Sequence, residues 1–242
     1  MKSLRAAFSF LTILRIPGEE PGPEELAGAP AWFPFVGVVL GLAVLAIAEL
    51  GGKLDSPGLA AFLAVVFLAW ITRGLHLDGL ADWADGFGAK NREECLRIMA
   101  EPGIGSFGVI ALVLLLVGKY ICLAELFSQH QSYSAIFLAP VLSRWVLSYF
   151  LVKTPYARKG GRAAVFKENP QPALLQKASV IALASILIAS PVRGLFYWGC
   201  ILLASGLIYY HARQRIGGIT GDVLGAMAEV SEFAILALAC LL

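Results

Sequence analysis

Apolar stretches of about 17 to 22 residues follow one another along most of this 242-residue chain, close to the roughly 20 residues that a membrane-crossing helix needs. Polar residues gather in the connections between the stretches. The pattern predicts transmembrane helices near 31–50, 58–75, 106–127, 133–152, 174–190, 194–210 and 222–242. We therefore predict an all-α, polytopic membrane bundle of about seven helices that forms a single domain over 1–242.

The N-terminal residues follow a helical period instead of being continuously apolar. Leu4, Phe8 and Leu11 share one face of a helix, and Arg5 lies on the opposite face. This pattern is typical of a short helix that lies in the membrane interface and does not cross the bilayer. We predict an interfacial amphipathic helix over 1–16.

Composition excludes the soluble classes. The chain is 58% hydrophobic and 15% charged, whereas soluble domains carry about 25% charged residues. The formal net charge is only +2, and no basic cluster is interleaved with aromatic residues. A nucleic-acid partner is therefore not expected, and the expected macromolecular environment is the lipid bilayer.

The distribution of lysine and arginine predicts an orientation. These residues are frequent before residue 31 and in 73–105, 153–173 and 211–221, and rare in the other connections. The positive-inside rule then places the N-terminus and these connections in the cytoplasm. We expect a multi-pass protein of the cytoplasmic (inner) membrane of a prokaryote, with its active site on the cytoplasmic side.

Three aspartates follow the second apolar stretch at intervals of four and three residues. Asp78, Asp82 and Asp85 therefore share one face of a helix. Clustered carboxylates are hard ligands suited to Mg²⁺ or Mn²⁺. Asp78 and Asp85 are about 10 Å apart in a straight helix, so either Gly79 bends the chain or two metal positions exist. The ordinary alternative is a solvated acidic helix face.

Residues next to this acidic segment are further candidates. His76 is a candidate metal ligand or proton acceptor, or alternatively a hydrogen-bonded structural group, and Arg73 is a candidate substrate contact. The segment 99–108 is rich in glycine and precedes the third apolar stretch. The backbone N–H groups at Gly103 and Gly105 are therefore candidates for holding a phosphate at a helix N-terminus.

Acidic residues also occur within the last apolar stretch. Asp222, Glu229 and Glu232 fall on one helix face, and charged groups in a membrane are too costly to face lipid. Their complements are Lys119 and Arg144, the basic residues within apolar stretches. Two interpretations of Glu229 and Glu232 stay open: substrate contacts together with Arg144, or a buried ion-pair network. Asp222, at the cytoplasmic end, is the better candidate for contact with substrate or metal.

The most basic connection, 153–177, contains Tyr156 and Arg158. Cationic side chains above an acidic metal site are suited to binding a polyphosphate, since arginine can bind two oxygens at once. Ordinary loading of a cytoplasmic loop with positive charge is the alternative explanation. We predict that Tyr156 and Arg158 contact substrate.

Five motifs occur in an order and spacing that resemble the cobalamin synthase family, the adenosylcobinamide-GDP ribazoletransferases. The resemblance covers about 73–232, and its motifs are HLDGLADWADG, IMAEPGIGSFG, LSRW, PYAR and GGITGDVLGA. It implies a Mg²⁺-dependent membrane transferase, with Mn²⁺ as a substitute, whose metal ligands are Asp78, Asp82 and Asp85. Glu101 departs from the pattern, because the family favours aspartate there.

The resemblance also implies a reaction. Adenosylcobinamide-GDP condenses with α-ribazole or its 5′-phosphate, which gives adenosylcobalamin or its phosphate and releases GMP. Asp82 or His76 would accept the proton of the attacking hydroxyl group. Homo-oligomers, or association with other enzymes of cobalamin assembly, are the expected partners.

Two other functions compete with this interpretation. A CDP-alcohol phosphotransferase also uses clustered aspartates at a membrane surface, but its motif continues with an Ala-Arg pair that is missing after Asp82. A transporter could use Glu229 and Glu232 as a coupling site. Transporters often contain repeated halves, and no repeat is visible in this sequence.

Overall fold

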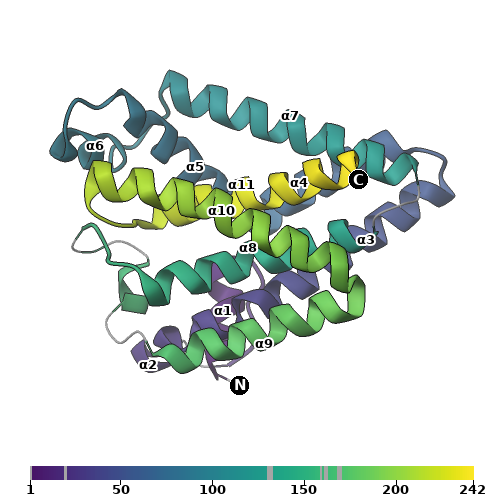
Figure 1. Cartoon of the computed structure of the whole chain (residues 1–242), viewed down its shortest axis with the longest axis horizontal. Coiled ribbons are helices and arrows are strands. Elements are labelled where there is room, and N and C mark those ends of the chain that lie inside the picture. The colour runs from purple at the N-terminus through teal and green to yellow at the C-terminus, as the bar shows by residue number, and fades with distance from the viewer. Residues whose placement is uncertain (1, 19–20, 130–132, 159, 161–162, 168–170) are drawn as a thin grey trace.

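The structure is a computed structural model that describes residues 2–18, 21–129, 133–158, 160, 163–167 and 171–242. In this part of the chain the regular elements are α-helices and short 3-10 turns. The long helices lie side by side along the longest axis of the molecule (Figure 1). Helices satisfy their own backbone hydrogen bonds, as a lipid environment requires. The predicted all-α polytopic bundle is confirmed.

Among the described residues, six helices are long and apolar enough to cross a membrane. They are α3 (Phe33–Lys53, preceded by the 3-10 turn η1, Ala29–Trp32), α7 (Ser106–Ser128), α8 (Tyr133–Lys153), α9 (Pro172–Ala189), α10 (Pro191–Ile216) and α11 (Gly221–Leu241). A seventh span is counted if the bent pair α4 (Pro57–Ile71) and α5 (Leu75–Asp85) is one span. The predicted stretches agree with these helices, including the two shortest stretches, 174–190 and 194–210, which correspond to α9 and α10.

The chain turns by 85° between α4 and α5. Arg73 and Gly74 have φ values of 55° and 64°, and residues in this left-handed region commonly end helices. α4 is apolar throughout, whereas α5 carries three aspartates and a histidine. We therefore place the membrane-crossing part of the pair in α4 and treat α5 as lying outside it.

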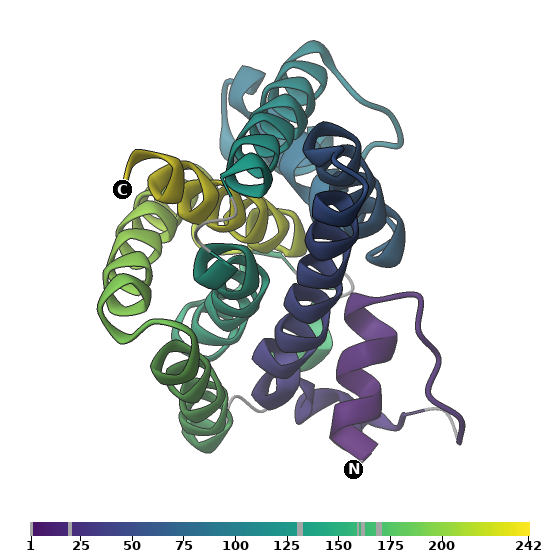
Figure 2. The same cartoon turned by 90° about the vertical axis from the view of Figure 1, so that its right-hand side faces the viewer.

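Helix α8 lies at the centre of the bundle, as the view along the long axis shows (Figure 2). Most of its residues are buried, and α3 packs closely along it. A Cβ atom at Gly37 of α3 would lie 2.4 Å from the carbonyl oxygen of Pro140 in α8. The absence of a side chain at Gly37 therefore allows the two helix backbones to touch. In contrast, α9 and α10 expose most of their apolar surface.

The short elements are α1 (Lys2–Leu11), α2 (Pro23–Ala27), η2 (Gly86–Gly88), α6 (Arg92–Ile98) and η3 (Ala164–Lys167). α1 is the predicted amphipathic helix and ends earlier than expected. Part of its apolar face, Ala6, Ala7, Phe8 and Leu11, is buried, and the helix contacts η1, α2 and α3. Its contact with a membrane interface stays a prediction.

The connections sort to the two ends of the bundle. α5, α6, the chain after α8 and the turn from α10 to α11 lie at one end, and the turns from α3 to α4 and from α9 to α10 lie at the other with the C-terminus (Figure 1). The same two groups were distinguished by their content of lysine and arginine. The basic connections thus share one end of the molecule.

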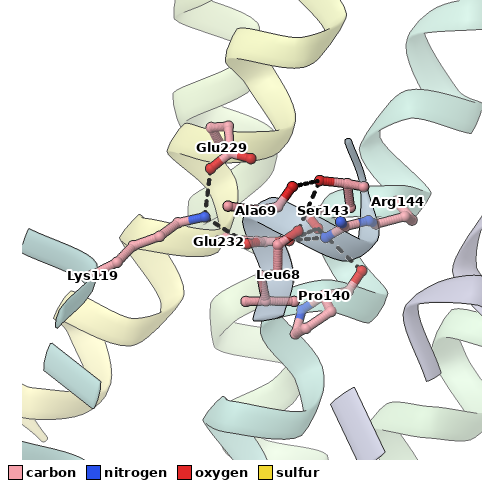
Figure 3. Close-up of polar contacts among 9 residues, drawn as sticks. Leu68, Ala69, Lys119, Pro140, Ser143, Arg144, Glu229 and Glu232 are labelled. Carbon is pink, nitrogen blue, oxygen red and sulfur yellow. Dashed lines mark hydrogen bonds and ion pairs between the residues drawn. The ribbon is translucent and has the colours of Figure 1, made fainter. Parts of the chain in front are cut away.

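A buried ion-pair network joins α7, α8 and α11 inside the bundle (Figure 3). Lys119 Nζ lies 2.5 Å from Glu229 Oε2 and 2.6 Å from Glu232 Oε2, and Arg144 pairs with Glu232. All four side chains are at most 8% exposed. Ser143 is hydrogen bonded to both Glu232 and Arg144. Two positive and two negative charges balance, so the network stabilises the contact of three helices.

Replacing Lys119 with methionine should destabilise the bundle. Lys119→Met leaves two buried glutamates with a single basic partner, and removing one member of a buried pair typically costs about 3 to 5 kcal/mol. The midpoint of thermal unfolding of the protein in detergent should fall clearly. Lys153→Met, at an exposed position in the last turn of α8, is the control. Equal midpoints for the two variants would contradict a stabilising role for the network.

Candidate active site

A pocket of about 500 Å³ lies at the basic end of the bundle. Its polar lining comes from two helices and one connection: His76, Asp78 and Asp82 of α5, Asp222 of α11, and Arg158 from the chain after α8. These are five of the residues that the sequence predicted for the site. The structure therefore gathers predicted residues that lie up to about 150 positions apart in the sequence into one pocket.

The other side of the pocket is apolar. Phe10 of α1, Phe33 of α3, Met99 after α6, and Leu147 and Leu151 of α8 line it. The rings of Phe10 and Phe33 stack with their centroids 6.0 Å apart. None of these residues was predicted, because an apolar residue in a membrane protein carries no signal that separates a pocket wall from a helix contact.

The polar side depends on a close crossing of α5 and α11. A Cβ atom at Gly79 would lie 2.8 Å from the carbonyl oxygen of Asp222, and one at Gly225 would lie 3.0 Å from the carbonyl oxygen of His76. The two backbones therefore touch, and the contact brings Asp222 beside the acidic face of α5. Gly79 thus serves the close approach of two helices, and α5 continues as a helix through it.

The carboxylates in the pocket influence one another. Burial, together with the negative charges of Asp222, Asp78 and Asp85, raises the pKa of Asp82 to about 7, although the positive charge of Arg158 acts in the opposite direction. Of the residues that the structure describes, three acidic side chains and one arginine line the pocket. The site therefore carries an excess of negative charge that a cation would neutralise.

Asp222 is held by two neighbours. Its Oδ2 atom accepts a hydrogen bond from Arg158 Nη2 at 3.0 Å and another from the hydroxyl group of Thr220 at 3.2 Å. Thr220 also caps the N-terminus of α11 by accepting from the N–H group of Val223. Thr220 was not predicted, although a threonine directly before the first residue of a helix is a capping signal.

The segment that carries Arg158 is attached to the start of α11. The N–H group of Ala157 donates to the carbonyl oxygen of Ile219 at 2.8 Å, and the N–H group of Ile219 donates to that of Pro155 at 3.0 Å. Tyr156 lies in this bridge and does not line the pocket. Residues 159 and 161–162 of the predicted basic segment lie outside the described residues.

His76 is buried against the pocket with an unsatisfied ring nitrogen. The residue is 3% exposed, and its Nδ1 atom has no hydrogen-bond partner among the described residues. Burial holds the pKa of His76 well below its ordinary value, and the positive charges of Arg144 and Lys119 lower it further. The imidazole is therefore neutral near pH 7 and offers a proton-accepting nitrogen.

The sequence predicted that Asp85 binds a metal ion, whereas in the structure its carboxylate binds backbone N–H groups. Its two carboxylate oxygens accept hydrogen bonds from the N–H groups of Gly105 at 2.7 Å and Gly108 at 2.8 Å, and Asp85 does not line the pocket. The glycine-rich start of α7 thus binds the carboxylate of Asp85, whereas the sequence predicted that it would hold a phosphate. Gly103 is exposed and does not line the pocket either.

Other predicted substrate contacts lie outside the pocket. The buried ion-pair network contains Arg144, Glu229 and Glu232. Their contacts therefore agree with the interpretation as an ion-pair network and not with the interpretation as substrate contacts. Arg73 donates to the carbonyl oxygen of Ser9 at 3.1 Å. It lines a separate hollow of about 330 Å³ next to the main pocket.

The described residues contain no group of three or more histidine, cysteine, aspartate or glutamate side chains placed to hold a metal ion by themselves. Mg²⁺ does not require such a cage, since it is usually bound by one or two carboxylates, water and the phosphates of a substrate. Asp78, Asp82 and Asp222 in one pocket fit this requirement. Their oxygen chemistry and their excess charge are both suited to Mg²⁺.

Comparison with known proteins assigns the chain to a family. The sequence profile of the cobalamin-5-phosphate synthases matches residues 3–240. This chain belongs to the cobalamin-5-phosphate synthase family. The resemblance found in the five motifs is thereby confirmed.

Relatives agree along the whole length of the chain. It is 39% identical to the adenosylcobinamide-GDP ribazoletransferase of Chlorobaculum parvum, over 97% of this chain and 93% of the relative. It is 38% identical to the protein of the same name from Thiobacillus denitrificans, over 99% and 95%. No solved structure matches this chain.

The contacts of Asp85 predict a structural role that can be separated from metal binding. Asp85→Ala removes the acceptor at the start of α7 and should lower stability by about 0.5 to 2 kcal/mol, as the loss of a helix cap does. Asp85→Asn keeps one acceptor oxygen and should lose less. Thermal unfolding and Mn²⁺ titration of the full-length protein measure the two effects. A loss of Mn²⁺ affinity at an unchanged unfolding midpoint would instead make Asp85 a ligand.

The helix crossing predicts a sensitive glycine. Gly225→Ala places a Cβ atom 3.0 Å from α5, so the two helices must separate by a few tenths of an ångström. We expect at least a tenfold loss of turnover with little loss of stability, because alanine favours a helix by about 1 kcal/mol over glycine. Gly206→Ala in α10, where the added atom meets nothing within 4 Å, is the control. Equal turnover in both variants would contradict the importance of the crossing.

Proposed function

We propose that this chain is an adenosylcobinamide-GDP ribazoletransferase that carries out its reaction in the pocket between α5, α8 and α11. Membership of the cobalamin-5-phosphate synthase family and the names of its relatives support the activity. The observation that supports the location is the convergence of three carboxylates, an arginine and a buried neutral histidine in one pocket. This set of groups is suited to transferring a phosphoryl group from a diphosphate.

The reaction replaces a phosphoanhydride bond by a phosphoester bond. A ribose hydroxyl oxygen of the ribazole forms a bond to the phosphorus atom that carries cobinamide. The bond from that phosphorus to the oxygen bridging the two phosphates breaks, GMP leaves with that oxygen, and the hydroxyl proton passes to a base. When the ribazole carries a 5′-phosphate that the product retains, the attacking oxygen is a ribose hydroxyl other than the 5′ one.

Each polar residue of the pocket has a task in this reaction. The Arg158 guanidinium can bind two phosphate oxygens and hold the diphosphate in line with the attacking hydroxyl group. His76 lines the pocket, and its neutral imidazole is suited to accept the hydroxyl proton. Asp82, partly buried and with its raised pKa, is the alternative base. Mg²⁺ would take ligands from one or two of the carboxylates of Asp78, Asp82 and Asp222 together with phosphate oxygens, and it would neutralise the charge that develops on the diphosphate.

The apolar wall offers a surface to the uncharged parts of the substrates. The stacked rings of Phe10 and Phe33 can pack against a planar aromatic base or the edge of a corrin ring. Most of the large apolar lining residues come from α1, α3, α8 and the residue after α6, whereas the carboxylates come from α5 and α11. This division orients a substrate with its diphosphate towards α5 and α11.

The orientation in the membrane follows from charge. α5 and the start of α11, which carry polar groups of the pocket, lie at the end with the basic connections (Figure 1), and such connections stay in the cytoplasm. Nucleotide substrates such as adenosylcobinamide-GDP are cytoplasmic compounds, which agrees with this orientation. The protein is therefore proposed to act at the cytoplasmic face of the inner membrane.

The transporter interpretation has little support in the contacts. Glu229 and Glu232 are paired with Lys119 and Arg144 inside the bundle, and the space next to them is only about 10 Å³. That space is at most sufficient for one water molecule. A coupling site would need room for an ion and its path.

Asp82 gives the direct test of the proposed chemistry. Asp82→Asn keeps the shape of the side chain and removes its charge, so GMP release from adenosylcobinamide-GDP and ribazole should fall by at least about 100-fold at saturating Mg²⁺. Asp55→Asn is the control, since Asp55 is exposed between α3 and α4 and its φ of 49° is tolerated by asparagine. Turnover near the control's level would rule out a role for Asp82.

A further inference from the structure

The ion pair of Arg158 and Asp222 joins two groups that the reaction needs separately. Arg158 is suited to bind the diphosphate, and Asp222 is suited to bind the cation, yet here each is the partner of the other. We propose that Asp222 exchanges partners: Arg158 holds it in the free enzyme, and the arrival of the diphosphate draws Arg158 away and releases Asp222 for the divalent cation. This inference deepens the proposed function and rests on it.

The exposure of the pair allows such an exchange. The side chains of Arg158 and Asp222 are 25% and 17% exposed, whereas Lys119 and Glu232 in the buried network are 5% and 4% exposed. A diphosphate entering the pocket can therefore reach the guanidinium group without unfolding any helix. Arginine binds phosphate oxygens in a bidentate manner, so the diphosphate can compete for the guanidinium group with the Asp222 carboxylate, which accepts a hydrogen bond from Arg158 Nη2.

The backbone on both sides of the pair is fixed. Pro155 and Ala157 are hydrogen bonded to Ile219, just before Asp222, and Arg92 Nη2 donates to the carbonyl oxygen of Ala157 at 3.1 Å. Asp222 itself lies in the first turn of α11. The exchange therefore needs only rotation of the long arginine side chain, while the carboxylate stays beside Asp78 and Asp82.

The charges in the pocket also favour binding of the diphosphate by Arg158 followed by binding of the cation by the carboxylates. Among the described residues, Arg158 is the one basic side chain that lines the pocket with the three aspartates in the free enzyme. When its charge turns to the diphosphate, the three carboxylates lose their neutralising partner and attract a divalent cation more strongly. Nucleotide and cation would thus each strengthen the binding of the other, as linkage requires.

The exchange predicts that Arg158 competes with the cation when no nucleotide is present. Removing Arg158 should then tighten the binding of Mn²⁺ alone, and the gain should depend on Asp222. A general gain from removing any positive charge near the pocket would not depend on Asp222. A double-mutant cycle separates these two causes.

The experiment measures the dissociation constant of Mn²⁺, by the electron paramagnetic resonance signal of the free ion, for full-length protein in detergent without nucleotide. The variants are Arg158→Gln, Asp222→Asn, the double variant and Arg73→Gln, the last as a control that removes a nearby charge outside the main pocket. Gel filtration and thermal unfolding verify that each variant is folded.

Arg158→Gln should bind Mn²⁺ at least about fivefold more tightly than the unchanged protein, at the lower end of typical coupling effects. The same substitution in the Asp222→Asn background should change the affinity by less than twofold, and Arg73→Gln should leave it nearly unchanged. An equal gain in both backgrounds, or no gain at all, would overturn the exchange while leaving the metal site intact. Absence of Mn²⁺ binding with and without adenosylcobinamide-GDP would instead remove the metal from the proposed function, and the exchange with it.

Discussion

One physical constraint determines where charged side chains lie in this protein: an ionised group within an apolar bundle needs a partner of opposite charge. Inside the bundle the partners come from the protein, since Lys119 and Arg144 balance Glu229 and Glu232. At the basic end the balance among the described residues is incomplete, because three aspartates and one arginine of this part of the chain line the pocket. An unpaired charge is costly in an apolar environment. The buried network meets this cost with ion pairs inside the protein, whereas the pocket carboxylates and Arg158 are suited to bind cations and phosphates from outside.

The two groups are connected through helix packing. α11 carries Glu229 and Glu232 in its middle and Asp222 at its start, so the network that fixes α11 against α7 and α8 also fixes the position of the pocket carboxylate. The contact at Gly79 and Gly225 then sets the approach of α5. His76 lies between the two regions, close enough to Arg144 and Lys119 for their charges to lower its pKa. The neutral state of the candidate base thus depends on the structural network behind it.

Much of the fold could be predicted from the sequence because each span is a local property of about 20 apolar residues. The pairing of Glu229 and Glu232 with Lys119 and Arg144 was also foreseeable, since few charges occur inside the spans and they must find each other. The motifs identified the family. The pocket brings together five residues that were predicted for the site: Asp78, Asp82, Asp222, Arg158 and His76.

The remaining features depend on contacts between distant segments. The carboxylate of Asp85 reaches N–H groups 20 and 23 residues away, and helical spacing alone cannot distinguish it from Asp82. A backbone N–H group can bind a phosphate only if no side chain of the folded protein already accepts its hydrogen bond, and the local sequence does not show this. Phe10 joins the pocket because α1 packs beside α3, which no local pattern indicates.

The central claim is that the incompletely balanced carboxylates hold a divalent cation against the diphosphate. Electron–nuclear double resonance of Mn²⁺ bound to the full-length protein with adenosylcobinamide-GDP tests it most directly, because the method detects phosphorus nuclei coordinated through oxygen. We expect a ³¹P coupling typical of a phosphate bound directly to the metal. Bound Mn²⁺ without such a coupling would contradict the account.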